Sequence, residues 1–229
     1  MTPGVSATRL VVFDCDGTLV DSQHAIVEAM TQAFAGHSLP LPDAESVRRV
    51  VGLALPEAVA RLMPLAAMDR LDSVSTAYKD AFTDIRLRPG HEEPLYPGVR
   101  EALTLLLESG AMLGVATGKS RNGLLRVLEV HGLRDSFITL KTADDGPGKP
   151  NPDILLDAMA ETGAMPETTV MIGDTTFDIE MAVRARALSI GVAWGYHPSN
   201  ELTAAGALRI AKQYGELPTM IANLWETGS

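Results

Sequence analysis

Cysteine is almost absent from this sequence, with Cys15 as its single example among 229 residues. One thiol cannot form an internal disulfide framework, which excludes the small secreted domains that depend on one. Long hydrophobic runs are also lacking, so we predict no membrane-spanning segment, and the first residues, MTPGVSATR, lack the apolar stretch of a signal peptide. We therefore expect a protein of the reducing cytoplasm with no membrane partner.

Positive charge is scarce as well. The 19 Lys and Arg residues face 29 Asp and Glu residues, which gives a formal net charge of −10. Because a nucleic-acid backbone requires a basic surface, we expect no nucleic-acid partner. Small phosphorylated molecules are not excluded, since their site can be locally positive. The hydrophobic content of 46% and charged content of 21% are ordinary for a globular protein of one domain or two small ones.

The segment Leu10–Ser22, LVVFDCDGTLVDS, contains an apolar run that ends abruptly in two carboxylates. A buried strand does not tolerate two unpaired charges, so a compensating group is needed, and a metal ion is the natural candidate. Because side chains alternate along a strand, Asp14 and Asp16 should point to one side and Cys15 to the other. The acidic groups therefore lie at the carboxyl end of a predicted strand, where open α/β sheets bind their ligands.

Downstream of residue 96, helical and strand patterns alternate regularly. Strands are expected over 111–117, 137–140, 169–173 and 188–194, and helices over 97–110, 124–130, 151–163 and 177–187. Asn151 is the expected N-cap of the third helix, with Pro152 at its first helical position. Strands that alternate with helices of this length predict right-handed βαβ units and a parallel, three-layer α/β sandwich.

Between residues 21 and 94 the alternation disappears, and no strand is predicted there. Two amphipathic helices are expected instead, and their apolar faces consist of Ile26, Ala29, Met30, Ala33 and Phe34, and of Val74, Ala77, Tyr78, Ala81, Phe82 and Ile85. Shorter helical pieces are expected over 46–51 and 56–63. We predict an all-helical domain, residues 21–94, inserted into an α/β core domain formed by residues 1–20 and 95–229.

Three further segments place polar side chains at the ends of predicted strands or in the loops that follow them. Thr117 and Gly118 end one strand, Lys149 lies in an irregular loop, and Asp174 ends another strand with Asp178 one helical turn later. Taken singly, a Thr-Gly pair is usually a turn and a loop lysine is usually solvated. Two carboxylates so spaced can share a metal, and Mg²⁺ prefers such oxygen ligands.

Together these segments resemble the four motifs of the haloacid dehalogenase (HAD) superfamily, in family order. LVVFDCDGT resembles motif I, the strand that ends in Thr117 resembles motif II, GKPNPDIL resembles motif III, and GDTTFD resembles the GDxxxD of motif IV. The whole chain is most similar to the phosphoglycolate phosphatase-like subfamily. The resemblance implies a Rossmann-like, HAD-like core, and the helical insertion resembles the C1 cap that closes over the active site in such proteins.

The resemblance also implies roles for the matching residues. Asp14 would be the nucleophile that forms an aspartyl-phosphate, Asp16 the general acid/base, and Mg²⁺ the cofactor. The implied catalytic set is completed by Thr117 and Lys149. The implied substrate-binding residues are Thr117, Gly118, Lys149 and Cys15, the last through its backbone N–H. The implied metal ligands are Asp14, Asp174, Asp178 and Asp16, the last through its main-chain carbonyl.

The aspartate at position 16 separates branches of this superfamily, because the dehalogenases and phosphonatases lack it. Its presence implies a Mg²⁺-dependent phosphatase that acts on a small phosphomonoester, phosphoglycolate or a related metabolite. A phosphomutase of the β-phosphoglucomutase type is an alternative, but those enzymes carry a Ser-Arg pair just after a cap glycine, whereas Leu53 and Ala54 follow Gly52 here. A catalytically silent phosphate-binding protein is the other alternative, although it would not require the acid/base. We expect a monomer or a homodimer.

Some residues keep two interpretations. Asp178 stands three residues after Thr175, so it is either a metal ligand or a helix-capping residue that orients others. Lys119 is expected to be solvated or to lie at the edge of the substrate site. The apolar loop Leu53–Leu55 is either a specificity element or an ordinary helix start. The histidines show no metal-ligand spacing, and His24, close to motif I, is the one to watch.

Overall fold

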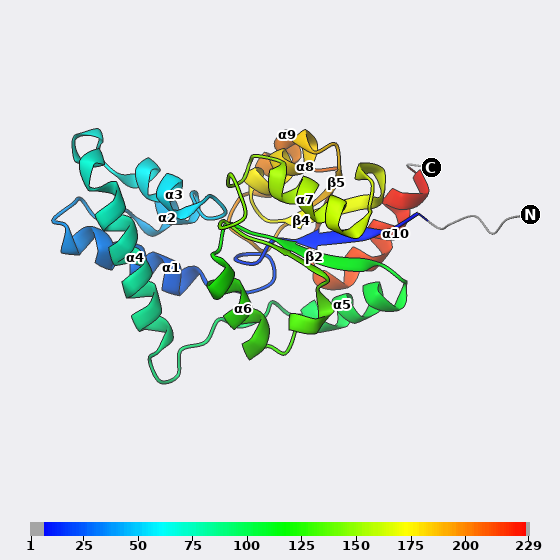
Figure 1. Cartoon of the computed structure of the whole chain (residues 1–229), viewed down its shortest axis with the longest axis horizontal. Helices are drawn as coiled ribbons and strands as arrows, with labels where there is room; N and C mark the ends of the chain where they lie inside the picture. The colour runs from blue at the N-terminus through cyan, green and yellow to red at the C-terminus, as the bar shows by residue number, and fades with distance from the viewer. Residues whose placement is uncertain (1–6, 228–229) are drawn as a thin grey trace, which may run out of the picture.

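In the computed structural model, which describes residues 7–227, the chain forms a six-stranded parallel sheet with helices on both faces and a helical insertion at one end (Figure 1). The strand order is β3-β2-β1-β4-β5-β6. The strands are β1 (Leu10–Phe13), β2 (Met112–Ala116), β3 (Thr139–Lys141), β4 (Thr169–Gly173), β5 (Leu188–Val192) and β6 (Arg209–Ala211). The predicted α/β fold class is therefore confirmed.

The apolar run of β1 is explained by its central place in the sheet, because both of its faces are covered. Val11 and Phe13 belong to the core cluster shared with α5 (Val99–Glu108), α6 (Arg121–Val130) and α10 (Leu217–Thr227). Leu10 and Val12 belong to the cluster on the opposite face, shared with α7 (Asp153–Thr162) and α8 (Thr176–Arg184). A short helix, α9 (Ser199–Ala205), connects β5 to β6.

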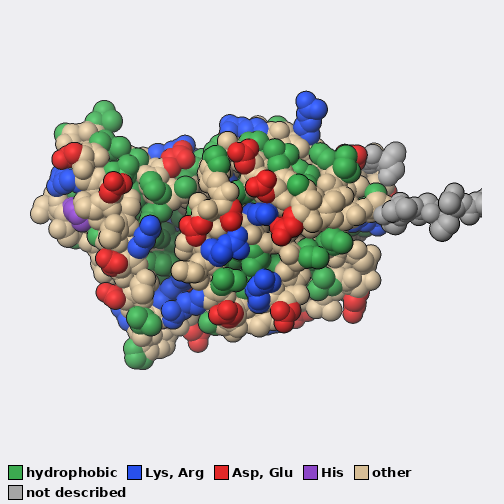
Figure 2. Space-filling view, viewed as in Figure 1, with side chains coloured by type: hydrophobic (Ala, Val, Ile, Leu, Met, Phe, Trp, Pro, Cys, Tyr) green, Lys and Arg blue, Asp and Glu red, His purple; other side chains and the backbone are tan. Residues whose placement is uncertain are grey.

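The helical insertion, which we define as α1 to α4 with their connections, lies beside the carboxyl ends of the strands (Figure 1). Its helices are α1 (Gln23–Gly36), α2 (Ala44–Arg48), α3 (Leu55–Leu62) and α4 (Leu71–Arg86). It has its own apolar core, in which Met30 and Phe34 of α1 pack with Val74 of α4. Acidic and basic side chains are interspersed on the face of the molecule shown in Figure 2.

The structure corrects several local predictions. The strand β6, the helix α9 and the C-terminal helix α10 were not predicted; β6 is only three residues long and begins at Arg209, which is exposed. The helix α7 begins at Asp153, with Pro152 rather than Asn151 at its N-cap. Asn151 nevertheless satisfies a backbone donor at the start of α7, since its Oδ1 accepts a hydrogen bond from the Asp153 N–H at 2.9 Å. Within residues 7–227, no helix combines the length and apolar character that a membrane crossing requires.

Candidate active site

The carboxyl ends of the central strands bring the predicted site residues together. Asp14 follows β1, Thr117 follows β2 and Asp174 follows β4, and these three strands are neighbours in the sheet. The Asp14 N–H donates to the Ile172 carbonyl at 2.9 Å, which continues the β1–β4 pairing to the first carboxylate. Gly17 turns the chain with a φ of +81°, and a Cβ there would collide with the Asp174 carboxylate. The tight turn therefore depends on glycine.

Lys149 is the central cation of the site, and its side chain is completely buried. Its Nζ lies 2.8 Å from Asp14 Oδ1 and 2.6 Å from Asp178 Oδ1. Burial acts to lower the pKa of Lys149, but the two carboxylates outweigh it and hold the pKa above its ordinary value. A charged ammonium group is thus fixed beside the proposed nucleophile by two independent contacts.

The buried acidic cluster of Asp14, Asp174 and Asp178 fits a divalent cation. One carboxylate oxygen from each residue lies within 4.8 Å of the others. Asp14 Oδ2 is buried and has no hydrogen-bond partner among the described residues. Burial, opposed by Lys149, raises the pKa of Asp14 to about 7, and burial together with Asp178 raises the pKa of Asp174 well above its usual range. The raised pKa values show that the protein groups alone do not compensate the negative charge of these carboxylates, and oxygen ligands of this kind suit Mg²⁺.

Both carboxylate oxygens of Asp178 already have protein partners. Oδ1 contacts Lys149, and Oδ2 accepts from the Thr175 backbone N–H at 3.0 Å and the Thr175 hydroxyl at 2.7 Å. These contacts form the capping box that the spacing predicted at the start of α8. The geometry favours capping and orientation of Lys149 as its role, while its participation in a metal site stays a prediction.

Two hydrogen bonds hold Asp174 in place. Asp174 Oδ1 accepts from the Thr18 hydroxyl at 2.7 Å, and Oδ2 accepts from the Tyr196 backbone N–H at 2.9 Å. Tyr196 and the buried His197, both in the loop after β5, were missed by the sequence analysis because nothing in the loop AWGYHP marks it as part of a site. His24, which was to be watched, is exposed.

Asp16 is bound at one oxygen by two donors. The Ser22 hydroxyl donates to Asp16 Oδ1 at 2.5 Å, and Lys119 Nζ lies 2.9 Å from the same oxygen. The solvated interpretation of Lys119 is wrong, because its side chain is only 6% exposed. Its other interpretation, a place at the edge of the substrate site, stands, since Lys119 lines the cavity described below.

The remaining predicted residues lie around Asp14. The Cys15 backbone N–H donates to Asp14 Oδ1 at 2.6 Å, and its thiol packs in the main core, where burial raises the pKa of the thiol. Thr117 is buried beneath the cavity, and its Oγ1 accepts a hydrogen bond from the Lys119 N–H at 3.3 Å.

Gly118 lies where the core and the insertion meet closely, because a Cβ on Gly118 would lie 2.6 Å from the Gly52 carbonyl oxygen. The roles of Cys15, Thr117 and Gly118 toward a substrate stay predictions.

A cavity of about 750 Å³ lies between these loops and the helical insertion. Asp14, Asp16 and Thr117 line it from the core, and apolar side chains such as Met30 and Phe82 line it from the insertion. The loop Leu53–Leu55 leads into α3, which begins at Leu55, so its interpretation as a helix start is confirmed. All three residues also line the cavity, and a role in specificity stays a prediction. The volume is within the range of small-molecule sites.

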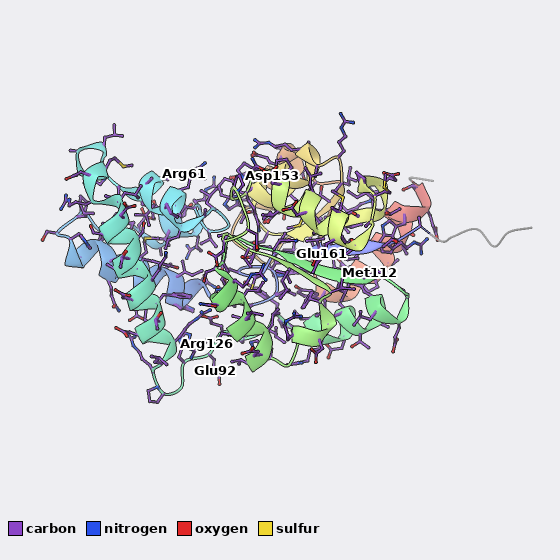
Figure 3. The ribbon with its side chains drawn as sticks, in the orientation of Figure 1. Arg61, Glu92, Met112, Arg126, Asp153 and Glu161 are labelled. Atoms are coloured by element: carbon purple, nitrogen blue, oxygen red, sulfur yellow. The ribbon has the colours of Figure 1, made fainter. Side chains whose placement is uncertain are left out.

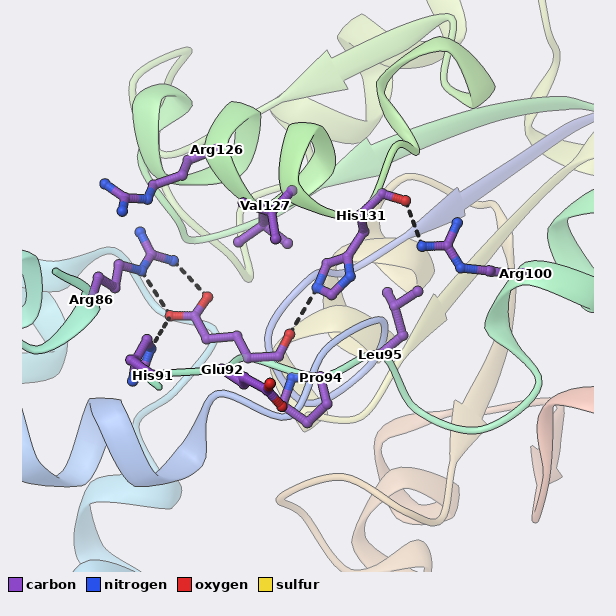
Figure 4. Close-up of a pocket in the computed structure, with 11 residues that line it drawn as sticks. Arg86, His91, Glu92, Pro94, Leu95, Arg100, Arg126, Val127 and His131 are labelled. Carbon is purple, nitrogen blue, oxygen red and sulfur yellow. Dashed lines mark hydrogen bonds and ion pairs between the residues drawn. The ribbon is translucent and has the colours of Figure 1, made fainter. Parts of the chain in front are cut away.

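A second cavity, of about 510 Å³, lies where the chain returns from α4 to the core (Figure 4). Arg86 contacts both carboxylate oxygens of Glu93 at 2.7 Å. The Glu93 carbonyl oxygen is 2.8 Å from His131 Nε2, and Arg100 donates to the His131 carbonyl at 2.6 Å. Figure 3 shows Glu92 and Arg126 at the same junction. These contacts hold residues 91–95, which connect α4 to the core, against the end of α6.

Comparison with known proteins gives a consistent result. The family model described as "Haloacid dehalogenase-like hydrolase" matches residues 11–192. The chain is 37% identical over 210 residues to "Probable phosphatase IndB" of Dickeya dadantii, an alignment that covers 91% of each protein. It is 29% identical over 220 residues to a phosphoglycolate phosphatase of Vibrio parahaemolyticus, with 93% of this chain and 96% of that protein covered.

A solved structure agrees with these sequence matches. The crystal structure of a hydrolase from Pseudomonas syringae superposes with a TM-score of 0.81 at 25% identity, and the match covers 94% of this chain and 99% of that one.

Proposed function

The chain belongs to the haloacid dehalogenase-like hydrolases and is a phosphoric monoester hydrolase of that family, and we propose that it uses Asp14 as the nucleophile on a small phosphomonoester. The proposal rests on one observation: Asp14 and Asp16 line the same cavity. Each has its Oδ1 bound by a lysine ammonium group, and among residues 7–227 no donor reaches either Oδ2. Two carboxyl groups that line one cavity therefore each keep one oxygen without a protein donor.

The first half of the proposed reaction transfers the phosphoryl group to the protein. A carboxylate oxygen of Asp14 forms a bond to phosphorus while the bond from phosphorus to the leaving oxygen breaks. Asp16 gives its proton to that leaving oxygen, which departs as an alcohol. Lys149, 2.8 Å from Asp14 Oδ1, and the Thr117 hydroxyl stabilise the negative charge on the phosphoryl oxygens.

The second half releases inorganic phosphate. Asp16 accepts a proton from a water molecule as the water oxygen attacks phosphorus, and the bond to Asp14 breaks, which restores both carboxyl groups. Mg²⁺, when held by Asp14, Asp174 and the Asp16 main-chain carbonyl, would neutralise charge on the carboxylates and on the phosphoryl oxygens. Asp178, whose Oδ1 lies 2.6 Å from Lys149 Nζ, holds this lysine in place.

The substrate is proposed to be a small phosphorylated metabolite, phosphoglycolate or a related compound, consistent with the phosphoglycolate phosphatases among the relatives. Lys79 and Arg86 of α4 and Arg126 of α6 also line the cavity, and we propose them as the groups that bind an anionic part of the leaving alcohol. Because the net charge is −10, nucleic acid is not a proposed substrate. A cytoplasmic location and a monomeric or homodimeric state belong to the same proposal.

The test is phosphate release from a panel of phosphomonoesters in the presence of Mg²⁺. The panel should hold phosphoglycolate, sugar phosphates, nucleotides and pyrophosphate, with EDTA and Asp14→Asn as controls. Release that requires both the metal and Asp14 supports the phosphatase, and the highest kcat/KM identifies the substrate class. Isomerisation of a sugar phosphate without phosphate release would favour the mutase, and binding without either reaction would favour the silent protein.

A further inference from the structure

Lys119 is a nearly buried cation whose position neither the four motifs nor the proposed metal site explains. It lies two residues beyond Thr117, its side chain is 6% exposed, and its Nζ contacts Asp16 Oδ1 at 2.9 Å. Burial acts to lower the pKa of Lys119, but Asp16 and other nearby groups outweigh it and hold the pKa above its ordinary value. The ammonium group is therefore charged where it meets the proposed acid/base.

The contacts of Asp16 are strongly asymmetric. Lys119 and the Ser22 hydroxyl both bind Oδ1, whereas among the described residues no donor reaches Oδ2. A carboxyl group whose Oδ1 is occupied by two donors must carry its exchangeable proton on Oδ2. The arrangement thus selects one oxygen of Asp16 for proton transfer.

Lys119 also connects the core to the helical insertion. Its Nζ lies 5.2 Å from the centre of the Phe82 ring on α4, within the range of a cation–π interaction. Arg86, one helical turn beyond Phe82, lies 4.4 Å from the same ring centre and is fixed by Glu93. Lys119 thus contacts Asp16 in the core and Phe82 in the insertion at the same time.

We propose that Lys119 is a positioning residue for Asp16. Lys119 holds Asp16 Oδ1 so that Asp16 Oδ2 faces the leaving oxygen, and the Phe82 ring covers Lys119 as it does so. This role rests on the phosphatase function proposed above. In the step concerned, the bond from phosphorus to the leaving oxygen breaks, a bond from phosphorus to Asp14 forms, and the proton on Asp16 Oδ2 moves to the leaving oxygen. Lys119 keeps its own protons.

The leaving group supplies the test, because 4-nitrophenolate departs without a proton whereas an alkoxide requires one. We would compare the single-turnover rate of leaving-group release from 4-nitrophenyl phosphate and from the best alkyl phosphate of the panel in the wild type and in Lys119→Met. This step precedes hydrolysis of the aspartyl-phosphate, in which Asp16 acts as the base whichever ester was used. General-acid catalysis contributes about 10²- to 10⁴-fold, so a misplaced acid should lower this rate for the alkyl ester by about tenfold to hundredfold. The rate for the nitrophenyl ester should change by less than about threefold, and the half-saturating substrate concentration should change little for either ester.

A double-mutant cycle shows whether Lys119 acts through Asp16. Asp16→Asn should give the same selective loss, and the double variant Asp16→Asn/Lys119→Met should be no slower on the alkyl ester than Asp16→Asn alone. Phe82→Leu, which keeps the lysine, should reproduce the selective loss in weaker form. Lys141→Met is the matched control, since it removes a lysine ion pair of 3.0 Å, to Glu161, outside the cavity.

The possible outcomes separate the two proposals. Equal losses of the single-turnover rate on both esters, a change confined to the half-saturating substrate concentration, or additive losses in the double variant would each overturn the positioning role and leave the phosphatase intact. Hydrolysis of neither ester by the wild type would overturn the proposed function itself, and this inference with it. Thermal unfolding of each variant shows that the rates compared belong to folded protein.

Discussion

The ammonium group of Lys149 lies 2.6 Å from Asp178 Oδ1, so a loop residue is held in the site by the first turn of a helix that begins 27 positions later. Asp178 in turn is fixed by Thr175 through the capping box of α8. The same lysine contacts Asp14 at 2.8 Å. Lys149 thus joins the carboxylate that follows β1 to the helix that follows β4.

Removal of this lysine should destabilise the protein as well as inactivate it. Lys149→Met leaves Asp14 and Asp178 buried without their cation, and breaking a buried ion pair costs about 3 kcal/mol or more. Urea denaturation in EDTA should therefore show a lower free energy of unfolding, and phosphate release should be lost. The exposed Lys212→Met serves as the control. An unchanged free energy of unfolding in Lys149→Met would contradict the role of this lysine in holding the cluster.

Mg²⁺ should stabilise the folded protein through the acidic cluster. At a concentration about 100 times its Kd, a ligand adds about 2.7 kcal/mol, which is roughly 5–10 °C in Tm for a protein of this size. Thermal melts with and without Mg²⁺ should show this rise in the wild type and not in Asp174→Asn. Asp157→Asn, which removes an exposed carboxylate, should keep it. A rise of the same size in Asp174→Asn would place the metal elsewhere.

The fold was largely predictable from the sequence because a buried parallel strand requires an apolar run on both faces. Leu10–Phe13 and Thr169–Gly173 satisfy that requirement and were predicted, whereas Arg209–Ala211 is a short edge strand with an exposed arginine. The edge position, not the local pattern, makes it a strand. The limits of the two domains, placed at 20/21 and 94/95, stay a prediction.

The site was predictable where a motif stands close together in sequence, and less so where contacts are long-range. Asp14 and Asp16 could be predicted because they stand together at the end of one apolar run, but the contact of Lys119 with Asp16 spans more than 100 residues. A lysine after a Thr-Gly turn is usually solvated, and the burial of Lys119 arises from the insertion that covers it. Tyr196 was missed for a related reason. It binds Asp174 through its backbone N–H, and because nearly every residue type has this group, the sequence does not reveal the contact.

The ion pair between Arg86 and Glu93 should make stability depend on pH. The two side chains are 10% and 8% exposed. Burial acts to raise the pKa of Glu93, but Arg86 and neighbouring cations outweigh it and lower the pKa below its ordinary value of 4.5. A lowered folded-state pKa means that the stabilisation is complete above about pH 4.5 and is lost as the pH falls through the lower, folded-state pKa.

Glu93→Gln checks this dependence. At pH 7 the variant should be less stable than the wild type by about 2 kcal/mol, since a charged hydrogen-bond partner is lost. The difference should shrink as both proteins are unfolded by urea at successively lower pH below 4.5, because the wild-type carboxylate is then protonated. A difference that stays constant down to pH 3 would show that the ionised carboxylate contributes nothing.

Gly118 should be intolerant of any side chain, because the insertion lies directly against it. A Cβ would lie 2.6 Å from the Gly52 carbonyl oxygen and 2.7 Å from that of Leu53. Gly118→Ala should therefore displace this loop and lower kcat/KM by about tenfold or more, as small misplacements of substrate contacts do. Trypsin should also cleave more readily after Arg49, which is exposed and lies just before this loop.

The matched control for Gly118→Ala is Gly146→Ala, where an added Cβ meets no atom within 4 Å. Its kcat/KM and its rate of tryptic cleavage should equal those of the wild type. If Gly118→Ala behaves in the same way as this control, the close contact between the core and the insertion has no part in substrate turnover.

The central claim is that Asp14 carries the phosphoryl group between the two halves of the reaction. Rapid acid quench of the wild type with substrate labelled in the phosphoryl group should trap label on the protein within the first turnover. The label should be released by hydroxylamine, as expected of an acyl phosphate, and Asp14→Asn should trap none. Product formation in the first turnover with no label on the wild-type protein would show direct attack by water and contradict the account.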